Sequence, residues 1–184
     1  MEIRKAHLSD CGELAQTSRR AFDADVEVGA PGPGGPPGYD SPEWYQRAMG
    51  WGQVFVLADA GRPVGGAIVF LKTPNEARLG RIWLVPEAQN RGLGRLAMAS
   101  LEAMFPAVSH WTLDTPVWNT RNHHFYARCG YRVAGTQGAD QLLFEKVNDP
   151  VAGEERQECR SSDRTAADGP LRDSAGHGSR EGVP

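Results

Sequence analysis

The sequence lacks several features that would assign it to a common class of protein. No uninterrupted apolar run approaches the ~20 residues needed to cross a bilayer, and no apolar segment follows the basic residues of MEIRKAHLSD. We therefore expect neither a membrane span nor a secretory signal. The three cysteines (11, 129 and 159) include no C-x-x-C pair, which argues against a disulfide framework or a zinc site. The expectation is a reduced, cytoplasmic protein without a metal ion.

Basic residues are not concentrated anywhere along the chain. The formal net charge is -3 and no run of lysine or arginine stands out. A phosphate backbone or an anionic membrane surface attracts such runs. The composition therefore predicts no nucleic-acid partner and no membrane partner. Whether the subunits form a homodimer is left open.

The composition changes sharply after Asn148. Residues 149–184 contain no aromatic residue, and apart from Leu171 their apolar content is mostly alanine and valine. Such a segment buries too little apolar area to offset its ordering entropy. We therefore predict a single folded domain over residues 1–148, followed by a disordered polar tail over residues 149–184.

Turn residues and hydrophobic spacing divide the first 148 residues into strands and helices. Glycine and proline rule out regular structure in GAPGPGGPPG, and Ser41-Pro42-Glu43 is typical of a helix start. The predicted strands are 2–6, 53–59, 64–72, 77–85, 110–117 and 141–147. The predicted helices are 10–22, 42–49, 93–105 and 119–130. This order predicts one mixed α/β or α+β sheet of six or seven strands.

A glycine pair in VPEAQNRGLGRLAMASLEAM stands between a predicted strand and a predicted helix. GLGRLA fits G-x-G-x-x-A, a variant of the dinucleotide fingerprint, and Asp114 lies 20 residues beyond Gly94. However, PEAQNR separates Val85 from Gly92, whereas the fingerprint needs its first glycine at the strand end. The preceding strands also pair as a hairpin, which leaves no room for successive parallel units. A Walker A loop is excluded because the segment contains no lysine.

Two blocks resemble a different family. Gln89 to Gly94 reads QNRGLG and fits Q/R-x-x-G-x-G, one residue after LVPE. NTRNHHFYARCGY fits N-x(6)-Y-x(3)-G-[FY], with Asn119, Tyr126 and Gly130-Tyr131 at the defining positions. Both blocks, in this order and with a strand between them, resemble the GNAT-type N-acetyltransferase superfamily over about residues 1–147. The resemblance implies a mostly antiparallel sheet with helices on both faces and splayed central strands.

The glycine segment suits an acetyl-CoA loop on physical grounds as well. Uncommitted N–H groups at a helix N-terminus attract a pyrophosphate. Glycine lacks the Cβ atom that would keep a phosphate away from the backbone, and arginine adds charge-assisted bonds. The predicted cofactor-binding residues of this loop are Gln89, Asn90, Arg91, Gly92, Leu93, Gly94 and Arg95.

The resemblance also implies roles in catalysis. A backbone N–H at Leu84–Val85 would polarise the thioester carbonyl, since Pro86 has none to donate. Tyr126 is the candidate general acid for the departing thiolate. Asn119 lies two helical turns earlier on the same face and is expected to contact the pantetheine arm. The alternatives are a core role for Tyr126 and a helix-capping role for Asn119.

The general base is not identified by the sequence. The family often has a glutamate on the fourth strand, where this chain has Leu79, Arg81 and Trp83. Weaker candidates are Glu87, Asp114 and His123, and water-mediated deprotonation is an alternative. The acceptor pocket is expected to be lined by aromatic side chains, namely Trp44, Tyr45, Trp83 and Trp118. Acidic residues that would attract a cationic amine are Asp23, Asp25 and Glu27.

The sequence therefore predicts transfer of an acetyl group from acetyl-CoA to a primary amine of a small molecule, peptide or protein. The alternative of the same fold is a catalytically silent acyl-CoA-binding module, and the missing strand carboxylate favours it. The third hypothesis is a nucleotide-dependent oxidoreductase, which the G-x-G-x-x-A match would indicate.

Overall fold

The structure is a computed structural model, and it describes residues 1–148. The boundary predicted after residue 148 and the disordered tail predicted for 149–184 involve residues outside the described ones. The strands are β1 (Glu2–Lys5), β2 (Gln53–Asp59), β3 (Arg62–Thr73), β4 (Glu76–Leu84), β5 (His110–Pro116), β6 (Arg132–Gln137) and β7 (Gln141–Val147). The α-helices are α1 (Cys11–Asp23), α2 (Pro42–Ala48), α3 (Leu93–Ala103) and α4 (Thr120–Arg128). Short 3-10 helices are η1 (Leu8–Asp10), η2 (Ala24–Val28) and η3 (Pro86–Ala88).

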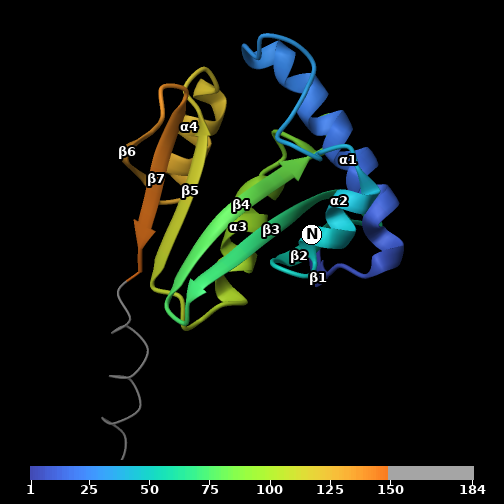
Figure 1. Cartoon of the computed structure of the whole chain (residues 1–184), viewed down its shortest axis with the longest axis horizontal. Coiled ribbons are helices and arrows are strands. Elements are labelled where there is room, and N and C mark those ends of the chain that lie inside the picture. The colour runs from blue at the N-terminus through green and yellow to red at the C-terminus, as the bar shows by residue number, and fades with distance from the viewer. Residues whose placement is uncertain (149–184) are drawn as a thin grey trace, which may run out of the picture. The chain divides into compact units, whose positions relative to one another are not determined.

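The seven strands form one mixed sheet in the order β1-β2-β3-β4-β5-β7-β6. Every neighbouring pair is antiparallel except β4 and β5. The β4–β5 pairing is limited to Glu76–Arg78 against His110–Thr112. Beyond Arg78 the two strands diverge, and β5 with β7 leans away from β4 with β3 (Figure 1). The predicted fold class, including the splayed central strands, is confirmed.

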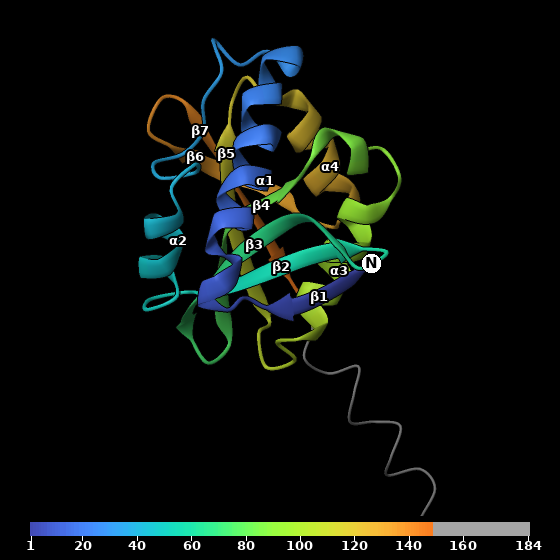
Figure 2. The ribbon, with the colours of Figure 1, turned by 90° about the vertical axis from the view of Figure 1, so that its right-hand side faces the viewer.

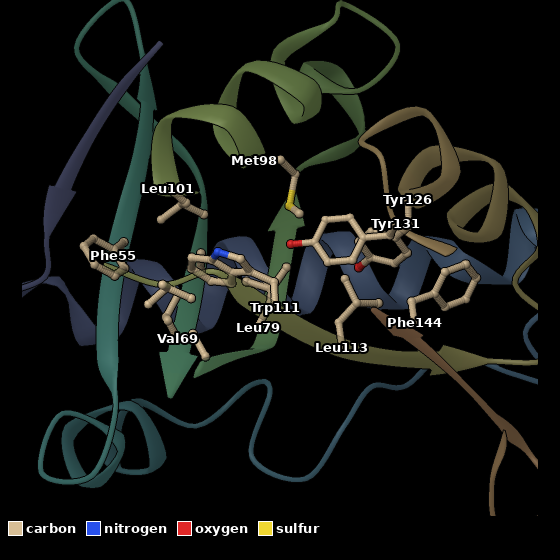
Figure 3. Packing of buried hydrophobic residues seen from close by; sticks show 13 residues of the cluster. Phe55, Val69, Leu79, Met98, Leu101, Trp111, Leu113, Tyr126, Tyr131 and Phe144 are labelled. Carbon is tan, nitrogen blue, oxygen red and sulfur yellow. The ribbon is translucent and has the colours of Figure 1, made fainter. Parts of the chain in front are cut away.

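Helices cover both faces of the sheet (Figure 2). Adjacent residues of β2 point to opposite faces: Val56 packs with Leu14 of α1 and Tyr45 of α2, whereas Phe55 packs in the cluster of α3 and α4. On the second face, Met98 and Leu101 of α3 lie over the strand residues of the core (Figure 3). No helix within residues 1–148 is long and apolar enough to cross a membrane.

A β-bulge at Gly80 interrupts the alternation of β4. Ile68 of β3 pairs with Arg81 and Val69 pairs with Leu79, so Gly80 is an extra residue. A Cβ atom at Gly80 would lie 2.1 Å from the ring of Phe70, so this position requires glycine. As a result Leu79 packs on the α3 face, while Trp83 packs on the α1 face. Of the three β4 positions that the sequence analysis compared with the family's glutamate, Leu79 therefore lies on the opposite face of the sheet from Trp83.

The strand that sequence reasoning did not locate is β6. Its residues are mostly exposed, with a register shift between Val133 and Gly135. An edge strand with few buried residues shows no apolar alternation, which is the signal used to find strands. Its pairing with β7 gives the seventh strand of the predicted six or seven.

Candidate active site

The loop between β4 and α3 has the backbone that a phosphate-binding turn needs. Asn90 and Gly92 adopt left-handed φ angles of 56° and 77°. Gly92 precedes α3 without a side-chain cap, and the first turn of α3 contains no acidic residue. The N–H groups at this helix start therefore have no carboxylate competing for them.

The two glycines serve different purposes. A Cβ atom at Gly92 would meet no other atom within 4 Å, so its left-handed φ explains glycine there. A Cβ atom at Gly94 would lie 3.0 Å from the ring of Phe125, so glycine there lets α3 approach α4. The reason given from sequence, that both glycines make room for phosphate, omitted this contact between helices.

One cavity of about 380 Å³ opens where β4 and β5 part. Its size suits a cofactor or small ligand. Its walls come from α1 and η2, from the end of β4, from the glycine loop with the start of α3, and from α4. The lining residues are Ala21, Phe22, Asp25, Ile82, Trp83, Leu84, Gln89, Asn90, Gly92, Gly94, Arg95, Arg121, Asn122, Phe125, Tyr126 and Arg128.

The main chain at Leu84 faces this gap. The N–H of Val85 donates to the carbonyl of Val64 in β3 at 2.8 Å, so Val85 has no free N–H for a ligand. Because successive residues of a strand alternate, the N–H and C=O of Leu84 point the other way, toward the space that β5 has left. The Leu84 carbonyl accepts a hydrogen bond at 2.8 Å from Nε2 of Gln89, in the loop that follows β4. Of the two residues predicted to supply the N–H, the structure favours Leu84 and excludes Val85.

Tyr126 lines the cavity and also belongs to the hydrophobic core. Its ring lies 5.1 Å from that of Phe125 and 5.8 Å from that of Phe144. Figure 3 shows Tyr126 and Phe144 together in the core. Among residues 1–148 the Tyr126 hydroxyl has no hydrogen-bond partner. Burial raises the pKa of this phenol above its ordinary value. The side chain is therefore a protonated donor at neutral pH, held by packing with its hydroxyl free for a ligand.

Asn119 is used within the protein. Its side chain is buried and accepts the N–H of Asn122 at 3.1 Å, which makes it the N-cap of α4. Its Nδ2 approaches a carboxylate oxygen of Asp25 at 3.5 Å. Asn119 does not line the cavity, whereas Asn122 does. The predicted contact with the pantetheine arm is not supported by this geometry, and the alternative capping role is observed.

Three other predicted cofactor residues lie outside the lining of the cavity: Val85, Arg91 and Leu93. Arg91 pairs with Asp59 at 2.9 Å, which ties the loop to the end of β2. Of the predicted substrate residues, only Trp83 lines the cavity. Tyr45 of α2 is fully buried in the cluster that contains α1, and Trp118 is half-buried in the turn before α4. The remaining predicted residues of the loop that line it are Gln89, Asn90, Gly92, Gly94 and Arg95.

The weaker candidates for a base are committed to other partners. Glu87 is exposed and pairs with Arg20 at 2.7 Å, and Asp114 pairs with Arg78. His123 Nε2 lies 3.0 Å from the carbonyl oxygen of Pro116. None of these three side chains lines the cavity.

Sequence reasoning missed much of the α4 wall. Arg121, Phe125 and Arg128 are spaced by four and three residues, so they share one face of the helix. That spacing is the signal that was present in NTRNHHFYARCG. Arg121 donates to Asp25 at 2.7 Å and to Gln89 Oε1 at 3.0 Å, which links η2, α4 and the loop across the gap.

The antiparallel surroundings of the β4–β5 pair exclude a dinucleotide fold built from parallel units. A splayed sheet with a glycine loop and helix start at the gap is instead the architecture of an acetyltransferase. The chain belongs to the acetyltransferase (GNAT) family, whose model matches residues 22–131. The cofactor of this family is acetyl-CoA.

The chain is also similar to other known proteins. The chain is 32% identical over 82 residues to the uncharacterized protein YrkN of Bacillus subtilis (strain 168), and the match covers 44% of each chain. The fold is similar to the PaiA N-acetyltransferase of Thermoplasma acidophilum in complex with coenzyme A, with a TM-score of 0.68, 18% identity, and coverage of 79% of this chain and 98% of that one. It is also similar to the ribosomal-protein-S18-alanine N-acetyltransferase of Escherichia coli, with a TM-score of 0.63, 20% identity, and coverage of 84% and 97%. At these identities the two structures show the fold.

Proposed function

We propose that this protein transfers an acetyl group from acetyl-CoA to a primary amine by direct attack on the thioester. The observation that carries the proposal is that one cavity brings together the glycine loop, the main chain of Leu84 and the hydroxyl-bearing ring of Tyr126. Family membership identifies acetyl-CoA as the cofactor, and the arrangement of the cavity supports direct transfer of its acetyl group to an amine.

The cofactor is held by its phosphates at the start of α3. Main-chain N–H groups around Gly92 and Gly94, with the helix dipole, bind the pyrophosphate. Arg95 and Arg128 line the same cavity and form no ion pair with any residue of 1–148, so their charges are available to phosphate. Arg91 supports the loop through Asp59.

The reaction follows from the groups that remain. The Leu84 N–H donates to the thioester oxygen and stabilises the negative charge that develops there. The neutral amine nitrogen attacks the carbonyl carbon, the C–S bond breaks, and the sulfur takes a proton from Tyr126. The nitrogen loses a proton as the amide forms, and this proton restores the phenol. Because the raised pKa keeps Tyr126 protonated, the phenol is in the donor form at neutral pH.

A second candidate function is an acyl-CoA-binding module without turnover. The observation that favours it is the absence of a carboxylate on β4 at the end facing the cavity, where Arg81, Ile82, Trp83 and Leu84 stand.

One experiment separates the two functions. Thiol release from acetyl-CoA is measured against a panel of small primary amines and N-terminal peptides, alongside calorimetry with coenzyme A. Turnover with at least one amine supports the transferase. Binding of coenzyme A without turnover supports the binding module. Absence of coenzyme A binding would reject both.

A further inference from the structure

Asp25 is the acidic residue in the lining of the cavity. It lies in η2, directly after α1, and is 8% exposed. Its neighbours Asp23 and Glu27 do not line the cavity. Asp23 instead accepts a hydrogen bond from Tyr39 at 2.8 Å and pairs with Arg19. Of the three acids that sequence reasoning grouped together, the structure places one at the candidate site.

The two oxygens of Asp25 have unequal partners. Oδ1 accepts a strong charge-assisted hydrogen bond from Arg121 at 2.7 Å. Oδ2 has only the long contact of 3.5 Å with Asn119 Nδ2, which is at the limit of a hydrogen bond. Oδ2 therefore keeps accepting capacity that the protein does not use. Burial raises the pKa of this carboxyl and the Arg121 charge opposes the increase.

Asp25 and Arg128 are associated with opposite ends of α4. Asp25 contacts Arg121 in the first turn of the helix, and Arg128 is its last residue. Seven residues of α-helix separate these arginines by about 10 Å, and Tyr126 lies between them in sequence. The cavity is thus lined by two arginines without an ion pair among residues 1–148, Arg95 and Arg128, and by a carboxylate that contacts the start of α4.

We infer that Asp25 is the acceptor-side residue of the reaction: its Oδ2 binds the ammonium form of the acceptor amine and takes its proton. This inference rests on the proposed acetyl transfer and adds the substrate class, an amine that is protonated in solution. The proton moves from the ammonium nitrogen to Asp25, and the freed lone pair attacks the thioester carbon. The thiolate leaves with the proton of Tyr126. As the amide forms, the nitrogen loses its second proton, which restores the Tyr126 phenol, and Asp25 releases the first proton to solvent.

The test compares two acceptors of similar shape that differ in protonation. Propylamine is an ammonium ion at pH 7, whereas trifluoroethylamine is mostly neutral there and needs no deprotonation before it attacks. We expect Asp25→Asn to lower kcat/KM for propylamine by about 10²-fold, the usual size of a general-base effect. The loss with trifluoroethylamine should be below about threefold, since the step that Asp25 serves is already complete.

Asp23→Asn is the matched control, since this acid lies two residues earlier and outside the cavity lining. Asp23→Asn should leave kcat/KM unchanged for both acceptors. Asp25→Glu retains the carboxylate, so its activity with propylamine should lie above that of Asp25→Asn. This result would show that a change of side chain at position 25 does not by itself abolish activity. Thermal melting and coenzyme A calorimetry on each variant report folding and cofactor binding separately.

Several results would overturn the inference. Equal losses with both amines would mean that Asp25 acts only by holding Arg121. A large loss of coenzyme A affinity in Asp25→Asn would place its role with the cofactor. Unchanged kcat/KM with propylamine would remove Asp25 from the reaction. A wild-type protein that binds coenzyme A but turns over no amine fails at the proposed function itself, and this inference fails with it.

Discussion

The two ends of β4 differ in what lies beside them. At its start, Glu76–Arg78 pairs with β5, and Ala77 and Trp111 of this paired segment are fully buried in the core under α3. At its other end, Ile82 to Leu84 faces a cavity, because β5 has diverged. Figure 1 shows both ends in one view, with the strands meeting at the bottom and separating toward α1 and α4.

The ion pairs at the two ends of β4 also connect different elements. At the paired end Arg78 binds Asp114 of β5 directly. At the open end no strand-to-strand contact is available, and Arg121 spans the gap from α4 to Asp25 and Gln89. A single strand thus contributes to a closed core at one end and to a site at the other. Substitutions at the closed end should change stability, and substitutions at the open end should change binding or turnover.

The largest effect is expected at the closed end, from Trp111→Ala. Trp111 is 1% exposed and contacts the core cluster of α3. Removing a buried tryptophan leaves a cavity and costs about 3–5 kcal/mol of unfolding free energy, which is measured by urea denaturation. Trp51→Ala is the control because that side chain is 55% exposed. Its cost should stay near or below 1 kcal/mol, and equal losses would contradict the comparison.

At the open end, Tyr126→Phe should separate activity from stability. The hydroxyl has no partner among residues 1–148, so its removal leaves no protein group unsatisfied and the melting temperature should change little. Loss of the general acid should lower the rate of thiol release by about 10²-fold, with coenzyme A affinity preserved. Tyr131→Phe is the matched control at the same ring cluster, and it removes a hydrogen bond to Glu102. The opposite pattern, lower stability and normal turnover, would make Tyr126 only a core residue.

Many of the helices and loops around β4 could be predicted from the sequence, because local features of the chain determine them. Ser41-Pro42 marked the start of α2, and the apolar spacing of Ala97 and Leu101 marked α3. QNRGLG was placed correctly at the start of the helix that follows β4, with Leu93 and Gly94 in the first turn of α3. These are short-range features of the chain, and turn and capping chemistry determine them.

What could not be predicted depends on contacts distant in sequence. Asp25 and Arg121 are 96 positions apart, and nothing in either local stretch indicates that they meet. The bulge at Gly80 depends on Phe70 of the neighbouring strand. Likewise Asn119 matched a family motif, but its position as the N-cap commits its side chain within the protein. Motif spacing places a residue on an element, and packing determines whether it reaches the cavity.

The cofactor loop offers a smaller effect with a close control. Gly92 and Gly61 have φ angles of 77° and 74°, and a Cβ atom at either would meet nothing within 4 Å. Alanine at either position should therefore cost a similar ~1 kcal/mol of stability from left-handed strain. Only Gly92→Ala should also weaken coenzyme A binding, by about tenfold, because the loop's N–H groups lose their alignment. Calorimetry and denaturation of both variants test this, and equal affinities would argue against phosphate binding at Gly92.

The smallest effects on the free energy of unfolding at pH 7 are expected from replacing the acid of the ion pair at each end of β4. These acids are Asp114 at the closed end and Asp25 at the open end. Asp114 and Arg78 are partly exposed, so Asp114→Asn should cost about 0.5 kcal/mol. Asp25 is different, because burial raises its pKa and Arg121 offsets only part of that increase. A raised pKa means that folding favours the protonated acid, so the ionised form subtracts from stability at neutral pH.

Asp25→Asn should therefore leave stability equal to, or up to about 1 kcal/mol above, that of the wild type at pH 7. The gain should disappear as the pH falls below about 4, where the wild-type acid is protonated in both folded and unfolded states. Urea denaturation of both proteins from pH 7 to pH 3 measures the difference. A cost of more than about 2 kcal/mol at pH 7 would show that the Asp25–Arg121 pair closes the open end as a net stabilising contact. The two ends of β4 would then differ in their separation from β5 but not in how their ion pairs contribute to stability.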